Sequence, residues 1–302
     1  MSDDLVSVVI PTYNSAPLLN RALHSVLGQT YTNWEVLVVD NSSTDDTDAV
    51  VEGFNDRRIR LLTVKNEGVI AKSRNLAIRE AKGRWVAFLD ADDWWTRNKL
   101  EISVRKLLTG ADIVYHDLLH AGPRSRYSLR RVVRTRKLQS PVYRDLVQFG
   151  NALLNSSVVV RRDILLDVGG LNENPRLVAA EDFECWLRIA RRTEKFHRIS
   201  GTYGSYWIGS ANTSSAERTL TCLTELRSRY LDRGVEAPAS SPVWLSFALG
   251  KANFELGDHK AAWLELACLK LLDGNVPIRQ WVRVAFLRCL IRAHLLLLPA
   301  RS

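Results

Sequence analysis

Four short apolar segments, rich in β-branched residues and closed by polar ones, alternate with segments of helical periodicity in the first third of the chain. The apolar segments are residues 6–10, 34–39, 59–64 and 85–90. Strands that are apolar along their whole length are typical of burial on both faces of a sheet. Strands that alternate with helices at this pace predict a mostly parallel, doubly wound α/β fold.

The segments between these strands predict helices. Apolar residues recur at helical spacing over 18–27 and 70–81, and residues 43–46 offer N-cap chemistry for a helix that ends near Phe54. Further along, the patterns predict strands at 112–116 and 156–160, a short helix and turn at 164–170, and a helix at 183–191.

The character of the chain changes near residue 215, where strand-like runs disappear and helical patterns take over. We therefore predict an α/β domain over residues 1–215 and a helical C-terminal region over 216–302. Residues 249–267 space small and large side chains like one tetratricopeptide helix pair. A single repeat cannot bury its own face, so we expect a helical appendage packed on the main domain rather than a solenoid.

Composition narrows the class of protein. Of 302 residues, 46% are hydrophobic and 25% charged, as in an ordinary globular protein. The formal charge of +9 favours an anionic partner: nucleic acid, a nucleotide or phosphate, or an acidic membrane face. No recognised nucleic-acid motif supports the first of these.

Targeting signals and cysteines give expectations about compartment. The four cysteines contain no Cys-x-x-Cys pair, which favours reduced thiols in the cytoplasm. The acidic start, Met1–Asp4, does not resemble a signal peptide, and no uninterrupted apolar run is long enough for a membrane span. We expect a cytoplasmic protein that is soluble or peripheral to a membrane.

Three carboxylates, Asp90, Asp92 and Asp93, follow the fourth apolar segment within four residues. Like charges this close raise one another's pKa unless a cation lies among them. Mg²⁺ or Mn²⁺ with oxygen ligands is the simplest such cation, and it commonly bridges a carboxylate to a phosphate. Because open α/β sheets hold ligands at strand ends, this is a candidate metal site; a solvated loop is the alternative.

Other motifs fall in matching places after predicted strands. They are Val8-Val9-Ile10-Pro11-Thr12-Tyr13-Asn14, the segment 39–47, the segment 66–75 and Glu181-Asp182 within 179–186. Together with Asp90-Ala91-Asp92 they resemble the family 2 glycosyltransferases over residues 5–215. The resemblance implies the GT-A fold, a nucleotide-diphospho-sugar transferase fold with a mostly parallel doubly wound sheet.

The resemblance implies a donor site for a nucleotide-sugar. Pro11 and Tyr13 would lie under the nucleotide base, and Lys72 or Arg74 would reach the base or the phosphates. Asn41 stands where the family commonly has an aspartate that accepts a hydrogen bond from the base. An amide donates as well as accepts, so this position does not identify the nucleotide base. UDP is favoured, with dTDP and GDP as alternatives. An ordinary surface role is the alternative for Arg74.

The Asp-x-Asp motif implies the metal corner of that site. By the resemblance, Asp92 binds Mg²⁺ or Mn²⁺, Asp90 hydrogen-bonds the ribose or the metal's water, and Ala91 lies between them at the donor. Asp93 would support the loop or the sugar. Many relatives carry a histidine near residues 206–210, but none is present here. Metal ligation is therefore expected to depend on Asp92, the phosphates and water.

Glu181 and Asp182 complete the implied site. By the resemblance, Asp182 is the general base that takes a proton from the acceptor hydroxyl. For both residues the alternative is electrostatic stabilisation of a helix N-terminus. The family also implies inversion at the anomeric carbon.

Two basic segments have two interpretations each. Arg124–Lys137 would bind an anionic or lipid-phosphate acceptor, or would be a solvated surface. The last helical segment carries Arg279, Arg283, Arg288 and Arg292 among apolar residues, and would lie on an anionic membrane or pack with an exposed arginine side.

We therefore expect a metal-dependent inverting glycosyltransferase, hexosyl or related, that acts on a glycan or lipid-linked acceptor. Its setting would be cell-surface polysaccharide, lipopolysaccharide or glycolipid assembly in the cytoplasm, at the inner face of the plasma membrane. The alternative is a nucleotide-binding or scaffold protein with a degenerate GT-A fold and a helical tail that recruits partners.

Overall fold

The computed structural model describes residues 4–122, 131–209, 215–231, 241–267, 269 and 278–297. Contacts within the chain divide it into two compact units. The first comprises described residues from 4 to 142, 152 to 175 and 181 to 209; the second comprises 143–151, 176–180 and described residues from 215 onward.

The first unit contains the sheet and its helices. The strands are β1 (Val6–Thr12), β2 (Trp34–Asp40), β3 (Ile59–Thr63), β4 (Trp85–Phe88), β5 (Trp94–Trp95), β6 (Ile113–Ala121), β7 (Val132–Val133), β8 (Val159–Arg161) and β9 (Phe196–Trp207). The helices are α1 (Ala16–Leu27), α2 (Thr47–Gly53), α3 (Ile70–Glu80), α4 (Lys99–Leu108), α6 (Arg162–Asp167) and α7 (Glu181–Ala190), with a short 3-10 helix at Asn155–Ser157.

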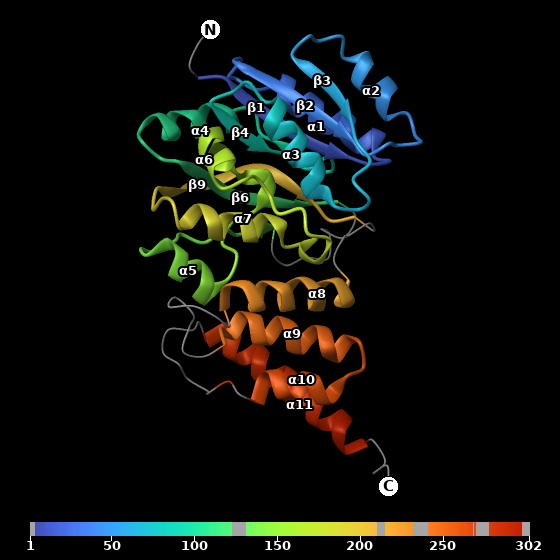
Figure 1. The fold of residues 1–302 in the computed structure, drawn as a ribbon, viewed down its shortest axis with the longest axis vertical. Coiled ribbons are helices and arrows are strands. Elements are labelled where there is room, and N and C mark those ends of the chain that lie inside the picture. Colours follow the sequence, from blue (N-terminus) through green and yellow to red (C-terminus); the bar gives the residue numbers. More distant parts are fainter. Residues whose placement is uncertain are drawn as a thin grey trace. The chain divides into compact units, whose positions relative to one another are not determined.

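The described strands form one nine-stranded sheet in the order β3-β2-β1-β4-β8-β6-β9-β5, with β7 beside β6. Strands β3, β2 and β1 lie side by side in Figure 1. The pairs β3–β2, β2–β1 and β1–β4 are parallel, as the apolar segments predicted. Beyond β4 the sheet is mixed, because β8 runs antiparallel to both β4 and β6. The predicted α/β fold is confirmed: the half built from residues 6–88 is all parallel, and β6 also pairs in parallel with β9.

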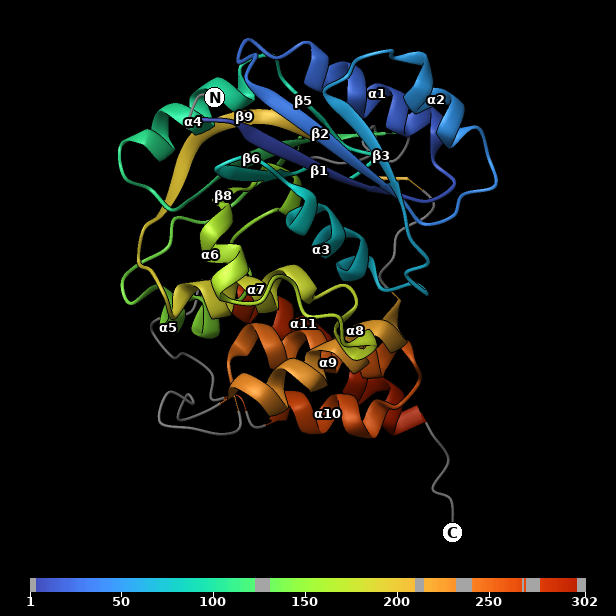
Figure 2. The ribbon, with the colours of Figure 1, turned by 45° about the horizontal axis from the view of Figure 1, so that its top comes forward.

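Both faces of the parallel half are covered by helices (Figure 2). Val8 packs in a core with Leu19 of α1 and Leu100 of α4. Phe88 meets Trp186 of α7 edge to face, with ring centroids 6.0 Å apart. Every residue of β1, β2 and β4 is buried, which is why these strands read as continuous apolar runs.

Several elements differ from the sequence predictions. The helix α4 and the strand β9 were not predicted, and β9 is partly exposed along most of its length. Gly204 lies within β9 where a Cβ would meet the Trp94 carbonyl oxygen at 2.9 Å, so a glycine permits the close approach of β5. The strand predicted at 156–160 begins only at Val159, and the helix predicted from Phe183 begins at Glu181.

The second unit is helical. Its elements are α5 (Val142–Phe149), a 3-10 helix at Pro175–Leu177, α8 (Ala216–Leu226) with a π-helical turn at Arg227–Leu231, α9 (Val243–Glu255), α10 (His259–Ala267) and α11 (Ile278–Leu297). Gly250 of α9 lies where a Cβ would meet Leu266 of α10 at 2.9 Å, so these two helices approach closely. Within the described ranges, no helix has the length and apolar character required to cross a bilayer.

Candidate active site

The loops that follow β1 and β2 are tied together at the carboxyl edge of the sheet. The Asn14 backbone N–H donates to Ser43 Oγ, and the Thr44 N–H donates to Asn14 Oδ1, both at 2.8 Å. Pro11 lies past the end of the β1–β4 pairing, where a residue without an N–H is tolerated. This arrangement leaves Tyr13 56% exposed, with its ring available to a flat ligand.

Asn41 follows β2, and its amide oxygen is already engaged. The Asn66 backbone N–H donates to Asn41 Oδ1 at 2.7 Å. Because a backbone N–H requires an acceptor, this bond assigns the oxygen and leaves the amide nitrogen as a donor. In the part of the chain that the structure describes, no group accepts from that nitrogen. Asn41 therefore offers a donor to a ligand, whereas an aspartate would offer an acceptor.

Lys72 lies near the surface on the first turn of α3. Its Nζ is 2.6 Å from Glu67 Oε2, and the two side chains are 30% and 78% exposed. Gly68 precedes the helix with a φ of +80°, and its N–H donates to Asn66 Oδ1 at 2.9 Å. The glycine thus supplies the turn that the sequence motif predicted.

Arg74 is buried at the centre of the candidate site. Its Nη1 is 2.7 Å from Glu181 Oε1 and its Nη2 is 2.7 Å from Asp90 Oδ1, so one guanidinium joins α3, the end of β4 and the start of α7. Burial alone would lower the pKa of Arg74, but the carboxylates of Asp90 and Glu181 raise it above its ordinary value. The side chain is 5% exposed and its guanidinium is occupied by these carboxylates, so it is not an ordinary surface arginine.

Asp90 is held by neighbours on several sides. Besides Arg74, the amide of Asn155 donates to Asp90 Oδ1 at 3.1 Å, and the Asp90 N–H donates to Ser156 Oγ at 3.1 Å. Asp93 is held by the backbone of β9, because the Trp207 N–H donates to Asp93 Oδ1 at 2.8 Å. Burial raises the pKa of Asp93 well above its usual range, and the charges of Asp90 and Asp92 add to this.

Asp92 lies between these two residues with a different environment. Its backbone carbonyl accepts from Arg21 Nη2 at 2.7 Å, whereas no other described residue donates to its carboxylate. Burial, together with the negative charge of Asp90, raises the pKa of Asp92 to about 6, although Arg21 opposes the shift. A carboxylate with a raised pKa and no donor from another described residue is stabilised by a cation.

Arg21 is fixed by aromatic side chains. Its guanidinium carbon lies 3.7 Å from the ring centroid of Trp94 and 4.5 Å from that of Trp207. Cation–π contacts on two rings restrict the guanidinium, so its bond to the Asp92 carbonyl fixes the backbone of the aspartate loop.

Few described side chains at this site could act as ligands of a hard divalent cation. Among the described residues, no group of three or more His, Cys, Asp or Glu side chains could hold a metal ion. Asp92 and the second oxygen of Asp90 are the available ligands. Mg²⁺ often binds through one or two carboxylates plus substrate phosphates, so the residues fit such a site only with a nucleotide present.

Tyr206 lies next to Trp207 on β9, in the segment where the expected histidine is missing. Burial raises the pKa of the Tyr206 phenol to about 12, and the carboxylates of Asp93, Asp90 and Asp92 contribute to the shift. The phenol is therefore a neutral group beside the aspartate loop.

Asp182 lies one residue into α7 and is half-buried. Burial, together with the negative charge of Glu181, raises the pKa of Asp182 to about 7, although Arg74 opposes the shift. Asp182 Oδ1 also accepts from the Phe183 N–H at 2.6 Å, so the carboxylate does interact with the helix N-terminus. A carboxyl group with a pKa near neutrality is suited to general base catalysis.

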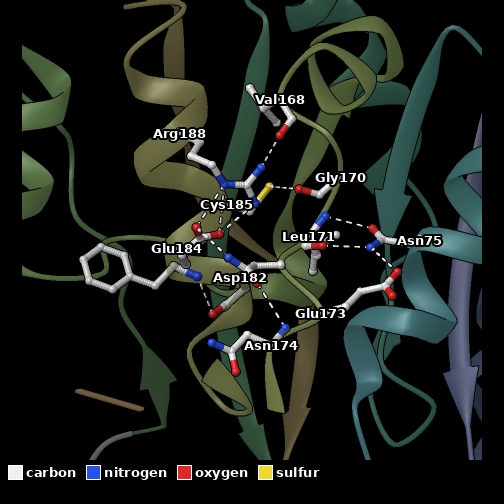
Figure 3. Close-up of polar contacts among 12 residues, drawn as sticks. Asn75, Val168, Gly170, Leu171, Glu173, Asn174, Asp182, Glu184, Cys185 and Arg188 are labelled. Atoms are coloured by element: carbon white, nitrogen blue, oxygen red, sulfur yellow. Dashed lines mark hydrogen bonds and ion pairs between the residues drawn. The ribbon is translucent and has the colours of Figure 1, made fainter. Parts of the chain in front are cut away.

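The segment before α7 is clamped from two sides (Figure 3). Asn75 of α3 donates to the Leu171 carbonyl and accepts from the Leu171 N–H, both at 2.8 Å. On the other side, Arg188 of α7 donates to the Val168 carbonyl. Gly170, with a φ of +72°, lies where a Cβ would meet Asn75 Oδ1 at 2.5 Å. Only a glycine fits this contact, which fixes the approach to Glu181 and Asp182.

Sequence reasoning did not find some of these residues. Asn75 is the residue after Arg74 in the motif at 66–75, so its position in the motif was a usable signal. Arg21 and Asn155 carry no signal in the sequence, because only the folded chain brings them to Asp92 and Asp90. Residues 124–130 of the predicted basic acceptor segment lie outside the described residues.

The sheet order and a carboxylate group at the carboxyl ends of parallel strands define a transferase fold of the GT-A type. A family model, Glycosyl transferase family 2, matches residues 7–155. The chain belongs to glycosyl transferase family 2: it is 30% identical over 217 residues to the Escherichia coli protein WfaP, with 71% of this chain and 81% of WfaP covered.

The matches to similar proteins cover different shares of those proteins' lengths. WfaP is named a UDP-Glc:alpha-D-GlcNAc-diphosphoundecaprenol beta-1,3-glucosyltransferase, and so is E. coli WfgD, which is 46% identical over 108 residues. That match covers 36% of this chain and only 43% of WfgD. Staphylococcus aureus TarS 1-349 in complex with UDP-GlcNAc has a TM-score of 0.57 at 19% identity, with 95% of this chain and 86% of TarS 1-349 covered. This likeness shows the fold.

Proposed function

We propose that the chain is a metal-dependent inverting glycosyltransferase that transfers a sugar from a nucleotide-sugar to a hydroxyl group of a glycan or lipid-linked acceptor. The observation that carries the proposal is the placement of Asp182, whose pKa is raised to about 7, in one charge network with the Asp-x-Asp aspartates. Arg74 joins the two halves of that network at 2.7 Å on each side.

The donor is a UDP-sugar in this proposal, with a dTDP-sugar as the alternative. Tyr13 stacks on the base, and such stacking is worth about 1–3 kcal/mol per base. The free amide nitrogen of Asn41 donates to a base carbonyl, a group that both uracil and thymine have. The names of WfaP and WfgD, which specify UDP-Glc, support the choice of UDP. Pro11 and Lys72 complete the rim of the donor site.

Asp92 and Asp90 would hold Mg²⁺ or Mn²⁺ when the diphosphate of a donor is bound. When bound, the metal acts as a Lewis acid that neutralises the charge on the departing diphosphate. Arg21 and Trp207 keep the aspartate loop, including Ala91, in position. Arg74 holds Asp90 next to the start of α7 through its ion pairs with Asp90 and Glu181.

Asp182 is the general base. It accepts the proton of the acceptor hydroxyl while the hydroxyl oxygen forms a bond to the anomeric carbon of the donor sugar. The bond between that carbon and the diphosphate oxygen breaks in the same step, so the configuration inverts. Glu181 is held by Arg74 and raises the pKa of Asp182, which tunes the base toward neutral pH.

In this proposal the enzyme acts in cell-surface polysaccharide or glycolipid assembly at the cytoplasmic face of a membrane. The diphosphoundecaprenol acceptors in the names of WfaP and WfgD support a lipid-linked acceptor. Arg131, Arg134 and Arg136, in the described part of the basic segment, would bind an anionic acceptor or form a solvated surface.

A nucleotide-sugar hydrolysis screen tests the proposal without knowledge of the acceptor. The wild-type chain should hydrolyse one UDP- or dTDP-sugar in the presence of Mn²⁺, and Asp182→Asn should retain nucleotide binding in calorimetry but lose turnover. Asp48→Asn, at an exposed aspartate of α2, is the matched control and should match wild type. Nucleotide binding without turnover on any donor would favour the scaffold alternative, and no metal-dependent nucleotide binding would refute the proposed enzyme activity.

A further inference from the structure

One side of α11 is exposed among the described residues of the helical unit. Trp281, Val284, Leu287 and Ile291 pack into the core of this unit with residues of α9 and α10. On the opposite side, Ile278, Val282 and Phe286 are 75%, 64% and 67% exposed. Residues four apart lie on the same side of a helix, so these three side chains form one line, here named the α11 stripe.

Arginines border the α11 stripe. The helix contains four arginines and no aspartate or glutamate. Arg288 donates to the Leu269 carbonyl at 2.8 Å and is therefore engaged on the core side. Arg283 and Arg292 are exposed, and at 3.6 residues per turn they lie on opposite flanks of the stripe.

The guanidinium groups of these flanking arginines extend along the helical unit. Arg283 lies 5.5 Å from the ring centroid of Phe247, and Arg292 lies 4.7 Å from that of Trp263. Arginine side chains can cover apolar surface with their stems while the charged end stays in a polar layer. An apolar line between two positive flanks is the pattern of a helix that lies in a lipid interface.

We propose that the α11 stripe binds the surface of an anionic lipid bilayer, with Val282 and Phe286 inserted below the headgroups and Arg283 and Arg292 among them. The charges favour a lipid surface over a second copy of the chain, because a symmetric pairing of two stripes would bring arginines of the same sign together. Anionic headgroups complement these charges.

This inference rests on the proposed function only for its biological setting, because bilayer binding requires no donor or metal. The test is co-sedimentation of the full chain with phosphatidylcholine vesicles, with and without phosphatidylglycerol. The wild-type chain should bind the vesicles that contain phosphatidylglycerol and should bind less as the salt concentration rises. Equal binding to both vesicle types, or no binding to either, would overturn the proposal.

A double variant, Val282→Ser with Phe286→Ser, tests the surface itself. Both side chains are exposed, so the unfolding temperature should match wild type, while partitioning onto anionic vesicles falls about tenfold, or about 1.4 kcal/mol. The matched control is Leu264→Ser on α10, where the side chain is 59% exposed and lies outside the stripe. An equal loss in the control would contradict the assignment.

Two more measurements separate the alternatives. Asp92→Asn should bind vesicles as wild type does, so failed catalysis and failed bilayer binding are distinguishable. If the wild-type chain is a dimer in light scattering and the double variant is a monomer with unchanged vesicle binding, the stripe covers a second copy and the proposal is wrong.

Discussion

Removal of the Arg74 guanidinium is the sharpest test of how the candidate site is held together. Arg74→Met keeps much of the side-chain volume but leaves the carboxylates of Asp90 and Glu181 without their cation. The side chains of Arg74 and Glu181 are 5% and 8% exposed, and Asp90 is 29% exposed, so the Glu181 pair is the buried one. Breaking a buried ion pair by removing one partner costs about 3–5 kcal/mol, and we expect the free energy of unfolding to fall by that amount near neutral pH.

The loss should depend on pH with a defined sign. Arg74 lowers the pKa of Asp182, so its removal raises that pKa above about 7, and Glu181 is left as a buried carboxylate without a counter-ion. The native variant then binds more protons than its unfolded chain between about pH 5 and pH 8, so the free energy of unfolding falls as pH rises. The deficit relative to wild type should be larger at about pH 8 than at about pH 5.

Urea unfolding followed by circular dichroism at both pH values measures this deficit. The matched control is Arg60→Met, which removes the arginine of an exposed pair with Glu80 at 2.9 Å. Exposed pairs contribute about 0–1 kcal/mol, so the control should change little. A deficit for Arg74→Met no larger than that of Arg60→Met, or one that grows toward low pH, would refute the buried ion-pair argument.

The remaining predictions concern the base, the loop and the metal. Because the pKa of Asp182 is about 7 and the base acts when deprotonated, the transfer rate should rise through pH 7, about tenfold per pH unit below it; a flat profile from about pH 6 to pH 8 would exclude this role. Gly170→Ala should destabilise by about 1–3 kcal/mol in thermal unfolding, because the Cβ meets Asn75 Oδ1 at 2.5 Å. Gly169→Ala has a similar φ of +79° with no atom within 4 Å and should cost less; equal losses would contradict the clash. Asp92→Asn should remove the Mn²⁺ dependence of UDP binding in calorimetry, and an unchanged Mn²⁺ effect would show that the ion binds elsewhere.

The local sequence was sufficient to predict the parallel half of the sheet. Every residue of β1, β2 and β4 is buried. Because burial on both faces of a sheet favours apolar residues at every position, these strands appear in the sequence as continuous apolar runs. The positions of Asp90 and Asp92 followed from the same logic, because residues after parallel strands meet at one edge of the sheet.

The sequence did not predict β9 or the partners of the aspartate loop. The residues of β9 are mostly half exposed, so its pairing with β6 and β5 depends on the shape of the sheet that it joins. Its Trp207 N–H reaches Asp93 across 114 residues of sequence, and no local pattern encodes a backbone bond of that range.

By itself, the sequence determined which residue types stand at the strand ends and which family the motifs resemble. Only the tertiary structure decided what those residues contact: Arg74 is occupied by Asp90 and Glu181, and Asn41 has its oxygen engaged and its nitrogen free. The physical reason is that ion pairs and hydrogen bonds form between groups that are close in space. A pattern along the chain records the burial of a residue, but it does not record its neighbours across the fold.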